Sequence, residues 1–233
     1  MFDNSQPLNK SLSAPVSARG LFGGSDSDDF DNESQQSTVS LAGFSFQLLE
    51  RPFHPLNANA VWPGAHVLAE WLTEHRALVA PPLRCLELGA ATGALALVAT
   101  SSLGLDWTTS DVDDGEVAEA IAANFALNSL TPPPHVPHTW GTPWEGGRYD
   151  VVLASDILLY VAVYPALVAT LEALCAPLDG APGAVFYMSW QRRMKESEQF
   201  FTLLKARGFA MEHLGRLVYR IAWSQLPHQA PLD

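Results

Sequence analysis

From residue 84 onward, short apolar runs typical of buried strands alternate with longer runs that have helical periodicity. The expected strands cover residues 84–88, 106–110, 135–140, 149–154 and 183–190, and the expected helices cover residues 92–102, 114–128, 163–176 and 193–207. Strands that alternate with helices in this way form a parallel sheet covered by helices on both faces. The sequence therefore predicts a doubly wound α/β domain.

The C-terminal part of the chain adds two strands of a different kind. Residues 209–214 and 217–223 are apolar runs joined by a short turn at Gly215. Parallel neighbours need a crossover of a dozen or more residues, so these two strands must be antiparallel to each other. Upstream, we expect a strand over residues 41–49 and a helix over residues 62–75. The whole is predicted to be a seven-stranded, mostly parallel sheet with an antiparallel last strand, in one domain covering residues 41–233.

Residues 1–40 have a different composition from the rest of the chain. They are rich in Ser, Gly, Asn and Asp and carry a net charge of −4. Such a segment cannot bury enough apolar surface to offset the entropy lost on ordering. The sequence predicts a disordered acidic tail over residues 1–40, either a solvating segment or one that is phosphorylated or binds a partner.

Charge and composition exclude several classes of function. The net charge of the chain is −12, which argues against binding to a nucleic-acid backbone. No apolar run reaches membrane-spanning length, and we expect no secretory signal because residues 1–10 lack an apolar run. Cys85 and Cys175 both lie in apolar runs, which indicates buried thiols in a reducing compartment. We expect a monomer without a metal site, located in the cytoplasm or also in the nucleus.

A ligand loop is predicted directly after the strand at residues 84–88. In doubly wound sheets ligands bind beyond the carboxyl ends of the strands, and here the next residues are Gly89-Ala90-Ala91-Thr92-Gly93. Glycines let the backbone approach a ligand, and the following helix offers unpaired N–H groups. The residues from Glu87 to Gly93 resemble, with one substitution, the pattern acid-x-G-x-G-x-G of the first motif of S-adenosylmethionine-dependent methyltransferases. The dinucleotide pattern G-x-G-x-x-G, read from Gly89, has two substitutions. A purely structural glycine turn is the alternative.

The next two strand ends carry candidate groups for an adenosine. Asp111 stands 22 residues after Gly89, at the tip of the second strand, where a carboxylate can accept hydrogen bonds from both ribose hydroxyls. A carboxylate at this place fits a nicotinamide dinucleotide and S-adenosylmethionine equally. The neighbouring Asp113 and Asp114 are alternative candidates for the ribose contact. Trp140 follows the third strand and is a candidate for stacking on adenine, with Trp144 as its rival.

The fourth strand ends in Ser155-Asp156, and Tyr160 follows four residues after the acid. An acid directly after an apolar strand lies at the same edge of the sheet as the other candidates. Its alternative role is to cap the next helix. The sequence therefore leaves both a functional and a structural role open for Ser155 and Asp156.

Taken in order, these segments resemble a known family. They are Val61-Trp62-Pro63-Gly64-Ala65, Leu86 to Gly93, Ser110-Asp111, Ala123-Asn124 with Leu127-Asn128, Trp140-Gly141, and Ser155-Asp156 with Tyr160. Over residues 44–215 the chain resembles the seven-β-strand methyltransferase family 16, which comprises non-histone protein-lysine methyltransferases that modify chaperones and translation factors. The resemblance implies a class I, Rossmann-like methyltransferase fold, S-adenosylmethionine as cofactor and a protein substrate.

The resemblance also implies roles for individual residues. The residues expected at the cofactor are Trp62, Glu87, Gly89, Ala90, Ala91, Gly93, Asp111, Trp140 and Ser155. Asp156 and Tyr160 are expected at the acceptor, where Asp156 would orient the lysine amine. Two departures stand out. Ala91 replaces a usual glycine, and Leu159 occupies the place of the tyrosine in the family's Asp-x-x-Tyr signature, so that Tyr160 comes one residue late.

Methyl transfer to lysine requires the neutral amine. With an ordinary lysine pKa of about 10.4, roughly 0.1% of the side chain is neutral near pH 7.4. An apolar slot lowers that pKa, and an aromatic wall from Tyr160, Trp62 or Trp190 would attract the incoming cation. The alternatives to a protein-lysine methyltransferase are a small-molecule or nucleobase methyltransferase, a cofactor-binding scaffold without turnover, and a nicotinamide-dependent oxidoreductase.

Overall fold

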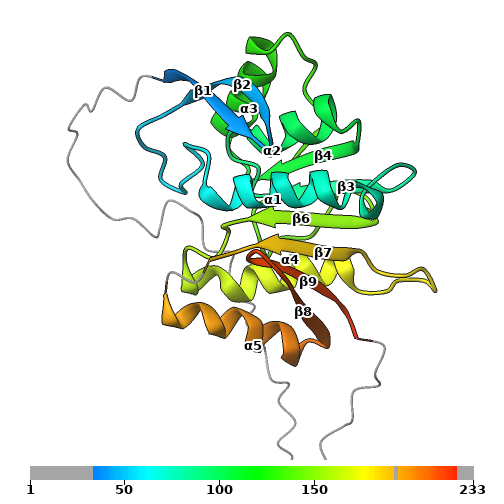
Figure 1. The fold of residues 1–233 in the computed structure, drawn as a ribbon. Helices are drawn as coiled ribbons and strands as arrows, with labels where there is room; N and C mark the ends of the chain where they lie inside the picture. Colours follow the sequence, from blue (N-terminus) through cyan, green and yellow to red (C-terminus); the bar gives the residue numbers. More distant parts are fainter. Residues whose placement is uncertain (1–33, 192–193, 225–233) are drawn as a thin grey trace, which may run out of the picture. The chain divides into compact units, whose positions relative to one another are not determined.

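The computed structural model describes residues 34–191 and 194–224, and its centre is a seven-stranded sheet (Figure 1). The strands are β3 (Arg84–Leu88), β4 (Asp106–Asp111), β5 (His135–Pro137), β6 (Val151–Ser155), β7 (Val185–Ser189), β8 (Phe209–Gly215) and β9 (Val218–Trp223). Their order in the sheet is β5-β4-β3-β6-β7-β9-β8. Strands β3 to β7 run parallel, and β9 is antiparallel to both β7 and β8. The predicted sheet, with its antiparallel last strand, is confirmed.

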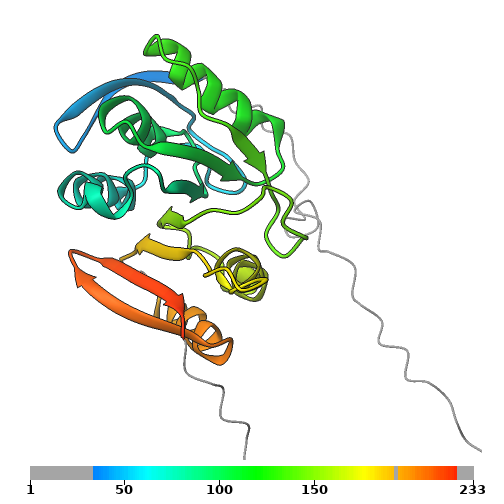
Figure 2. The same ribbon diagram turned by 90° about the vertical axis from the view of Figure 1, so that its right-hand side faces the viewer.

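Helices cover both faces of this sheet (Figures 1 and 2). The helices are α1 (Pro63–Glu74), α2 (Ala94–Leu97), α3 (Gly115–Leu127), α4 (Tyr164–Cys175) and α5 (Glu198–Ala206). On one face Trp71, Leu97 and Phe125 from α1, α2 and α3 are buried in one core with Trp107 and Leu153 of the sheet. On the other face α4 and α5 bury a second core against the sheet. Two separate cores fix the sheet from both sides and so hold its carboxyl edge in a defined shape.

Several elements are shorter than the sequence predicts; the helix expected over residues 193–207, for example, is an α-helix only over Glu198–Ala206. Two others differ more in character. The strand expected over residues 135–140 ends at Pro137, and the last hydrogen bond to β4 comes from His138 N, which donates to Asp111 O at 2.7 Å. The helix expected over residues 92–102 is an α-helix only from Ala94 to Leu97 and continues as a wider π-turn over Val98–Ser102. There the hydroxyls of Thr100 and Ser101 donate to carbonyls four residues earlier, which competes with regular helical hydrogen bonding.

The predicted boundary of the disordered tail is wrong for residues 35–40. Strand β1 (Gln35–Leu41) pairs along its whole length with β2 (Phe44–Glu50), through a two-residue turn at Ala42 and Gly43 in which both residues have positive φ. The sequence of β1 is mostly polar, so it did not predict a strand. β1 is a strand because it pairs with β2. The rest of the predicted tail, residues 1–33, lies outside the described residues.

Two asparagines of α3 and its C-terminal end hold this hairpin on the domain. Asn124 Oδ1 accepts a hydrogen bond from Leu49 N at 2.7 Å, and Asn128 exchanges two hydrogen bonds with the backbone of Gln47. Asn124 Nδ2 also donates to Thr92 O at 2.9 Å. These asparagines thus join the hairpin, α3 and the loop after β3 into one unit.

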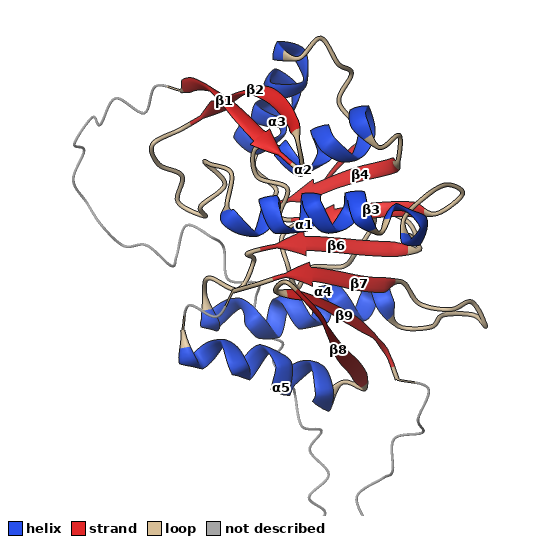
Figure 3. Ribbon diagram, viewed as in Figure 1, coloured by secondary structure: helices blue, strands red, loops and turns tan. Residues whose placement is uncertain are grey.

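A long loop connects β2 to α1 and runs without regular structure (Figure 3). We refer to residues 51–62 as the β2–α1 loop. No helix in the described part of the chain is both long and apolar enough to cross a membrane. Cys85 and Cys175 are buried free thiols, and burial raises the pKa of each to about 12.

Candidate functional site

The loop after β3 folds back on the end of β4. Gly89, Ala91 and Gly93 all have positive φ, between 48° and 74°. Gly89 N and Ala90 N both donate to Ser110 O, at 2.9 and 3.1 Å. A Cβ atom added at Gly89 would lie 2.8 Å from Ile157 Cγ2, so the loop also packs against the turn after β6. Only glycine combines this backbone conformation with such a close approach.

Asp111 is the hydrogen-bonding centre of this end of the sheet. Its Oδ2 accepts from Ala91 N at 2.7 Å, and its Oδ1 accepts from Val112 N at 2.7 Å. Burial raises the pKa of this carboxyl group above its usual value, while the two amides and the nearby His135 and His54 oppose the rise. Each oxygen can accept one more hydrogen bond, so the carboxylate can serve both the loop and a ligand.

Glu87, at the carboxyl end of β3, is almost fully buried. Its Oε2 accepts from the indole N–H of Trp107 at 3.0 Å. Burial raises the pKa of Glu87 to about 8, the hydrogen bond from Trp107 lowers it, and the charge of Asp111 raises it further. Burial thus favours the neutral form of both acids, and at Asp111 two backbone amides oppose this effect.

The two candidate tryptophans have different surroundings. Trp144 donates to Gly147 O at 2.7 Å and packs edge-on against His138 and Tyr149, so it is a structural residue of its loop. Trp140 is half-buried against the core that α4 and α5 cover. The segment before it is fixed to β4, since His138 N donates to Asp111 O at 2.7 Å. Of the two, Trp140 stays the candidate for an adenine.

Asp156 binds the start of α1. Its side chain is buried, and its Oδ2 accepts from Gly64 N at 2.7 Å. Asp156 N donates to Ser189 O at 3.0 Å, and Ser189 Oγ donates to Gly64 O at 2.7 Å. We call this closed set of three hydrogen bonds the Gly64–Asp156–Ser189 cluster. A Cβ atom at Gly64 would lie 2.9 Å from Asp156 Cγ, so glycine is required at this contact.

The structure therefore answers the question of helix capping. Helix α4 begins at Tyr164, well beyond Ser155 and Asp156, so neither residue caps it. Asp156 instead satisfies an amide in the first turn of α1, whose N-cap residue Trp62 supplies no capping hydrogen bond from its side chain. Ser155 is the last residue of β6, directly precedes Asp156 in the chain and is half-buried.

Tyr160 reaches the β2–α1 loop. The amide nitrogen of Asn57 donates to the Tyr160 hydroxyl, and the indole N–H of Trp62 donates to the Asn57 carbonyl at 2.9 Å. Trp62 and Tyr160, which are far apart in sequence, thus share one partner. At the other end of the loop, His54 Nδ1 accepts from Leu56 N and Ala58 N at 3.2 and 3.3 Å, and His54 Nε2 lies 3.7 Å from Asp114 Oδ2.

Contacts thus gather most of the predicted residues at one edge of the sheet. The loop of Gly89 meets the turn of Ile157, and Asp111 and Trp140 belong to the adjacent strand ends. Four further residues organise this edge although the sequence did not predict this role for them: His54, Asn57, Gly64 and Ser189. The Trp-Pro-Gly sequence at residues 62–64 was a usable signal for Gly64, but no spacing rule points to the other three.

Trp190 does not belong to an exposed aromatic wall. It is 7% exposed, and its ring packs against Phe201 and Tyr219 in the core. The expectation for this residue is wrong because the strand end that carries it is covered by α5 and β9. Tyr160 and Trp62 are half-buried and stay candidates.

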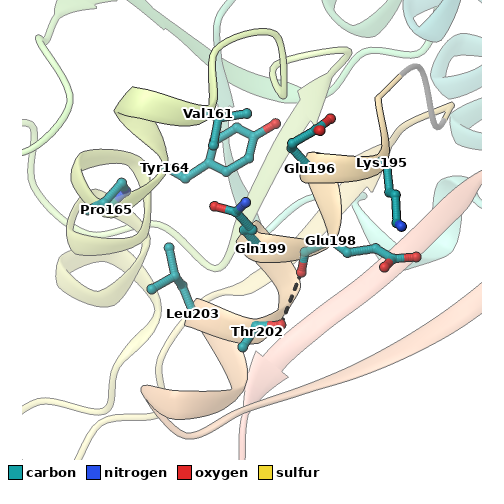
Figure 4. Close-up of a pocket in the computed structure, with 9 residues that line it drawn as sticks. All are labelled: Val161, Tyr164, Pro165, Lys195, Glu196, Glu198, Gln199, Thr202 and Leu203. Carbon is teal, nitrogen blue, oxygen red and sulfur yellow. Dashed lines mark hydrogen bonds between the residues drawn. The ribbon is translucent and has the colours of Figure 1, made fainter.

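A groove of about 720 Å³ opens between the first turns of α4 and α5 (Figure 4). Val161 and Pro165 line one side, and Gln199 and Leu203 line the other. None of the predicted site residues lines it, although Val161 directly follows Tyr160. The described residues include no group of three or more His, Cys, Asp or Glu side chains that could hold a metal ion.

Comparisons with known proteins agree with this architecture. A family model described as "Lysine methyltransferase" matches residues 52–207. The chain is 34% identical to the protein-lysine N-methyltransferase EFM3 of Chaetomium thermophilum over 64% of its length, but it spans only 47% of that relative. It is 28% identical to the EEF1A lysine methyltransferase 3 of Xenopus tropicalis, over 80% of this chain and 82% of that one.

Solved structures show the same fold at low sequence identity. The Thermus thermophilus 16S rRNA methyltransferase RsmC, in complex with AdoMet and guanosine, superposes with a TM-score of 0.55. The identity is 20%, over 83% of this chain and 51% of that chain. The glycopeptide N-methyltransferase MtfA, in complex with sinefungin, gives a TM-score of 0.50 at 15% identity, over 69% of this chain and 94% of that chain.

Proposed function

Because the chain belongs to the family of lysine methyltransferases, we propose that it transfers a methyl group from S-adenosylmethionine to a lysine side chain of a protein. The family match over residues 52–207 is the observation that carries the proposal, since it includes both the glycine loop and the segment of Asp156 and Tyr160. The chain spans about half of one relative and most of another, so its acceptor is proposed from chemistry and not transferred from either.

The carboxyl edge of the sheet fits the proposed cofactor. The residues around Gly89 carry small side chains and turn the backbone toward β4. Asp111 is held by two amides and keeps acceptor capacity for ribose hydroxyls, and the half-buried Trp140 offers a ring face for adenine. We assign cofactor binding to these residues together with Trp62, Glu87, Ala90, Ala91, Gly93 and Ser155.

Bound S-adenosylmethionine supplies a methyl group that is already activated as part of a sulfonium. The protein then has to orient the acceptor, exclude water and favour the neutral amine. Tyr160 and Trp62 offer half-buried aromatic surface on the β2–α1 loop side, which attracts a lysine cation before it loses its proton. Partial burial of the amine lowers its pKa and so raises the neutral fraction.

We propose two roles for Asp156. Its bond to Gly64 fixes the turn that leads to Tyr160, which is a positioning role. A direct hydrogen bond from the acceptor amine to Asp156 is the second role, and Asp156→Asn tests it. If the acceptor amine is oriented by the negatively charged carboxylate of Asp156, Asp156→Asn loses turnover. Its affinity for S-adenosylmethionine then stays within about threefold of the wild-type value.

Cofactor binding is the first experiment. S-adenosylhomocysteine at millimolar concentration should raise the melting temperature of the purified protein, because a ligand that binds only the folded state stabilises it. Asp113→Asn, at a neighbour of Asp111 in the loop after β4, is the control variant and should respond like the wild type. A melting temperature that does not move would contradict the proposal.

The acceptor is tested with tritiated S-adenosylmethionine. EEF1A, after which one relative is named, and a whole-cell lysate serve as acceptors. A labelled protein band that contains methyl-lysine by mass spectrometry supports the proposal. Label found only in small molecules would instead indicate a small-molecule methyltransferase, and cofactor binding without any label would indicate a scaffold.

A further inference from the structure

The turn between β6 and α4 is fixed at several points. Asp156 is bonded to Gly64 and Ser189, and Ile157 packs against Gly89. The Leu158 carbonyl accepts from the hydroxyl of the buried Tyr164 at 3.1 Å. These contacts leave Tyr160, at the end of the turn, as a half-buried ring beyond a rigid base.

The ring of Tyr160 is held from across the edge of the sheet. The side-chain amide of Asn57, 103 residues earlier in the chain, donates to its hydroxyl. Asn57 has a φ of 60°, a conformation that asparagine tolerates better than most residues. Its carbonyl accepts from Trp62, so one residue links both half-buried aromatic rings of this region.

We propose that Asn57 is a positioning residue that holds Tyr160 in the place where the acceptor lysine enters. This inference rests on the proposed function, because it assigns a specific part of the methyl transfer. It explains how a tyrosine that comes one residue later than the family spacing still has a defined position. The β2–α1 loop is then a wall of the acceptor entrance as well as a link from β2 to α1.

The side chain of Asn57 can be tested apart from its backbone. Asn57→Gly keeps the positive φ and the carbonyl that binds Trp62, and it removes only the amide that binds Tyr160. Tyr160→Phe removes the other half of the same bond. Ser129→Gly is the matched control, since Ser129 also has a positive φ, of 57°, and lies just beyond the end of α3.

Steady-state kinetics with the protein labelled in the acceptor experiment measure the effect. We expect Asn57→Gly and Tyr160→Phe each to lower kcat/KM for the acceptor about tenfold, and the double variant to lose no more than either single one. The dissociation constant for S-adenosylmethionine should stay within twofold in all three. Ser129→Gly should behave as the wild type in both measurements.

A conservative variant separates positioning from loss of structure. In Asn57→Asp the Tyr160 hydroxyl can donate to the new carboxylate, so kcat/KM should return to within about threefold of the wild type. The same substitution in a Tyr160→Phe background should give no recovery. Wild-type protein that labels no acceptor overturns the proposed function and this inference with it. Active wild type with an equally active Asn57→Gly variant, or with additive losses in the double variant, overturns the inference alone.

Discussion

The cofactor end and the acceptor end of the candidate site are built in different ways. At the cofactor end, Asp111 bonds to Ala91 and Glu87 bonds to Trp107, and each pair is 20 residues apart within one strand–helix–strand unit. At the acceptor end, the bonds from Gly64 to Asp156, Asn57 to Tyr160 and Ser189 to Gly64 span 92, 103 and 125 residues. These two hydrogen bonds of the first end join neighbours in sequence, whereas those of the second end depend on tertiary packing of α1 and its loop.

This difference predicts how each end responds to change. A local unit keeps its geometry when distant parts of the molecule are altered, so substitutions at the cofactor end should act on cofactor affinity and on the ionisation of its acids. The acceptor end joins three distant segments, so substitutions there should affect stability and turnover together.

The largest effect is expected from Glu87→Gln and depends on pH. The folded protein holds a proton on Glu87 up to about pH 8, whereas in the unfolded chain this carboxyl group has its ordinary pKa of 4.5. The folded state therefore binds more protons between these pH values, and wild-type stability falls as pH rises through this window. Glutamine removes that dependence, so the free energy of unfolding of the variant relative to wild type should rise by roughly 4 kcal/mol between pH 4.5 and pH 8.

Urea unfolding of both proteins across this pH range checks the prediction. Glu145→Gln, at an exposed position in the loop that contains Trp144, is the control. A stability difference between Glu87→Gln and wild type that does not change with pH would show that burial does not shift the pKa of Glu87, and the cofactor end would then lack its buried acid.

Asp111→Asn should weaken S-adenosylmethionine binding by about 3 kcal/mol, or roughly 100-fold. An asparagine has one acceptor oxygen in place of two, so it cannot keep both amide bonds and also receive ribose hydroxyls. Isothermal titration calorimetry measures the loss, with Asp113→Asn as control. If the two variants bind the cofactor equally well, Asp111 is only a loop anchor and the ribose assignment is wrong.

Gly64→Ala should cost about 2 kcal/mol of stability, because its Cβ would meet the Asp156 carboxylate and the Ser189 hydroxyl at 2.9 to 3.0 Å. We expect kcat to fall with stability, while the affinity for S-adenosylmethionine changes less than threefold. Gly115→Ala, in open space at the start of α3, is the control and should leave stability equal or slightly higher. If Gly64→Ala instead lowers the affinity for S-adenosylmethionine more than threefold, the two ends are not separate.

The same contrast explains what the sequence could predict. Periodic apolar runs predict the sheet, and Asp111 could be placed because it ends the strand that follows the glycine loop in the same unit. Strand β1 was missed, since its Gln- and Ser-rich residues look like a tail until β2 pairs with them. His54 and Asn57 lie in an irregular loop, and their partners Asp114 and Tyr160 are known only after the chain has folded.

The smallest effect is expected at the two tryptophans. Trp140→Leu should reduce S-adenosylmethionine affinity by about 1 kcal/mol, roughly fivefold, because it removes a stacking surface while keeping an apolar side chain. Trp144→Leu should lower the melting temperature, since it removes the bond to Gly147 and the edge contacts with His138 and Tyr149, but it should leave cofactor affinity unchanged. The reverse result, with affinity lost at Trp144, would place adenine in the 142–147 loop.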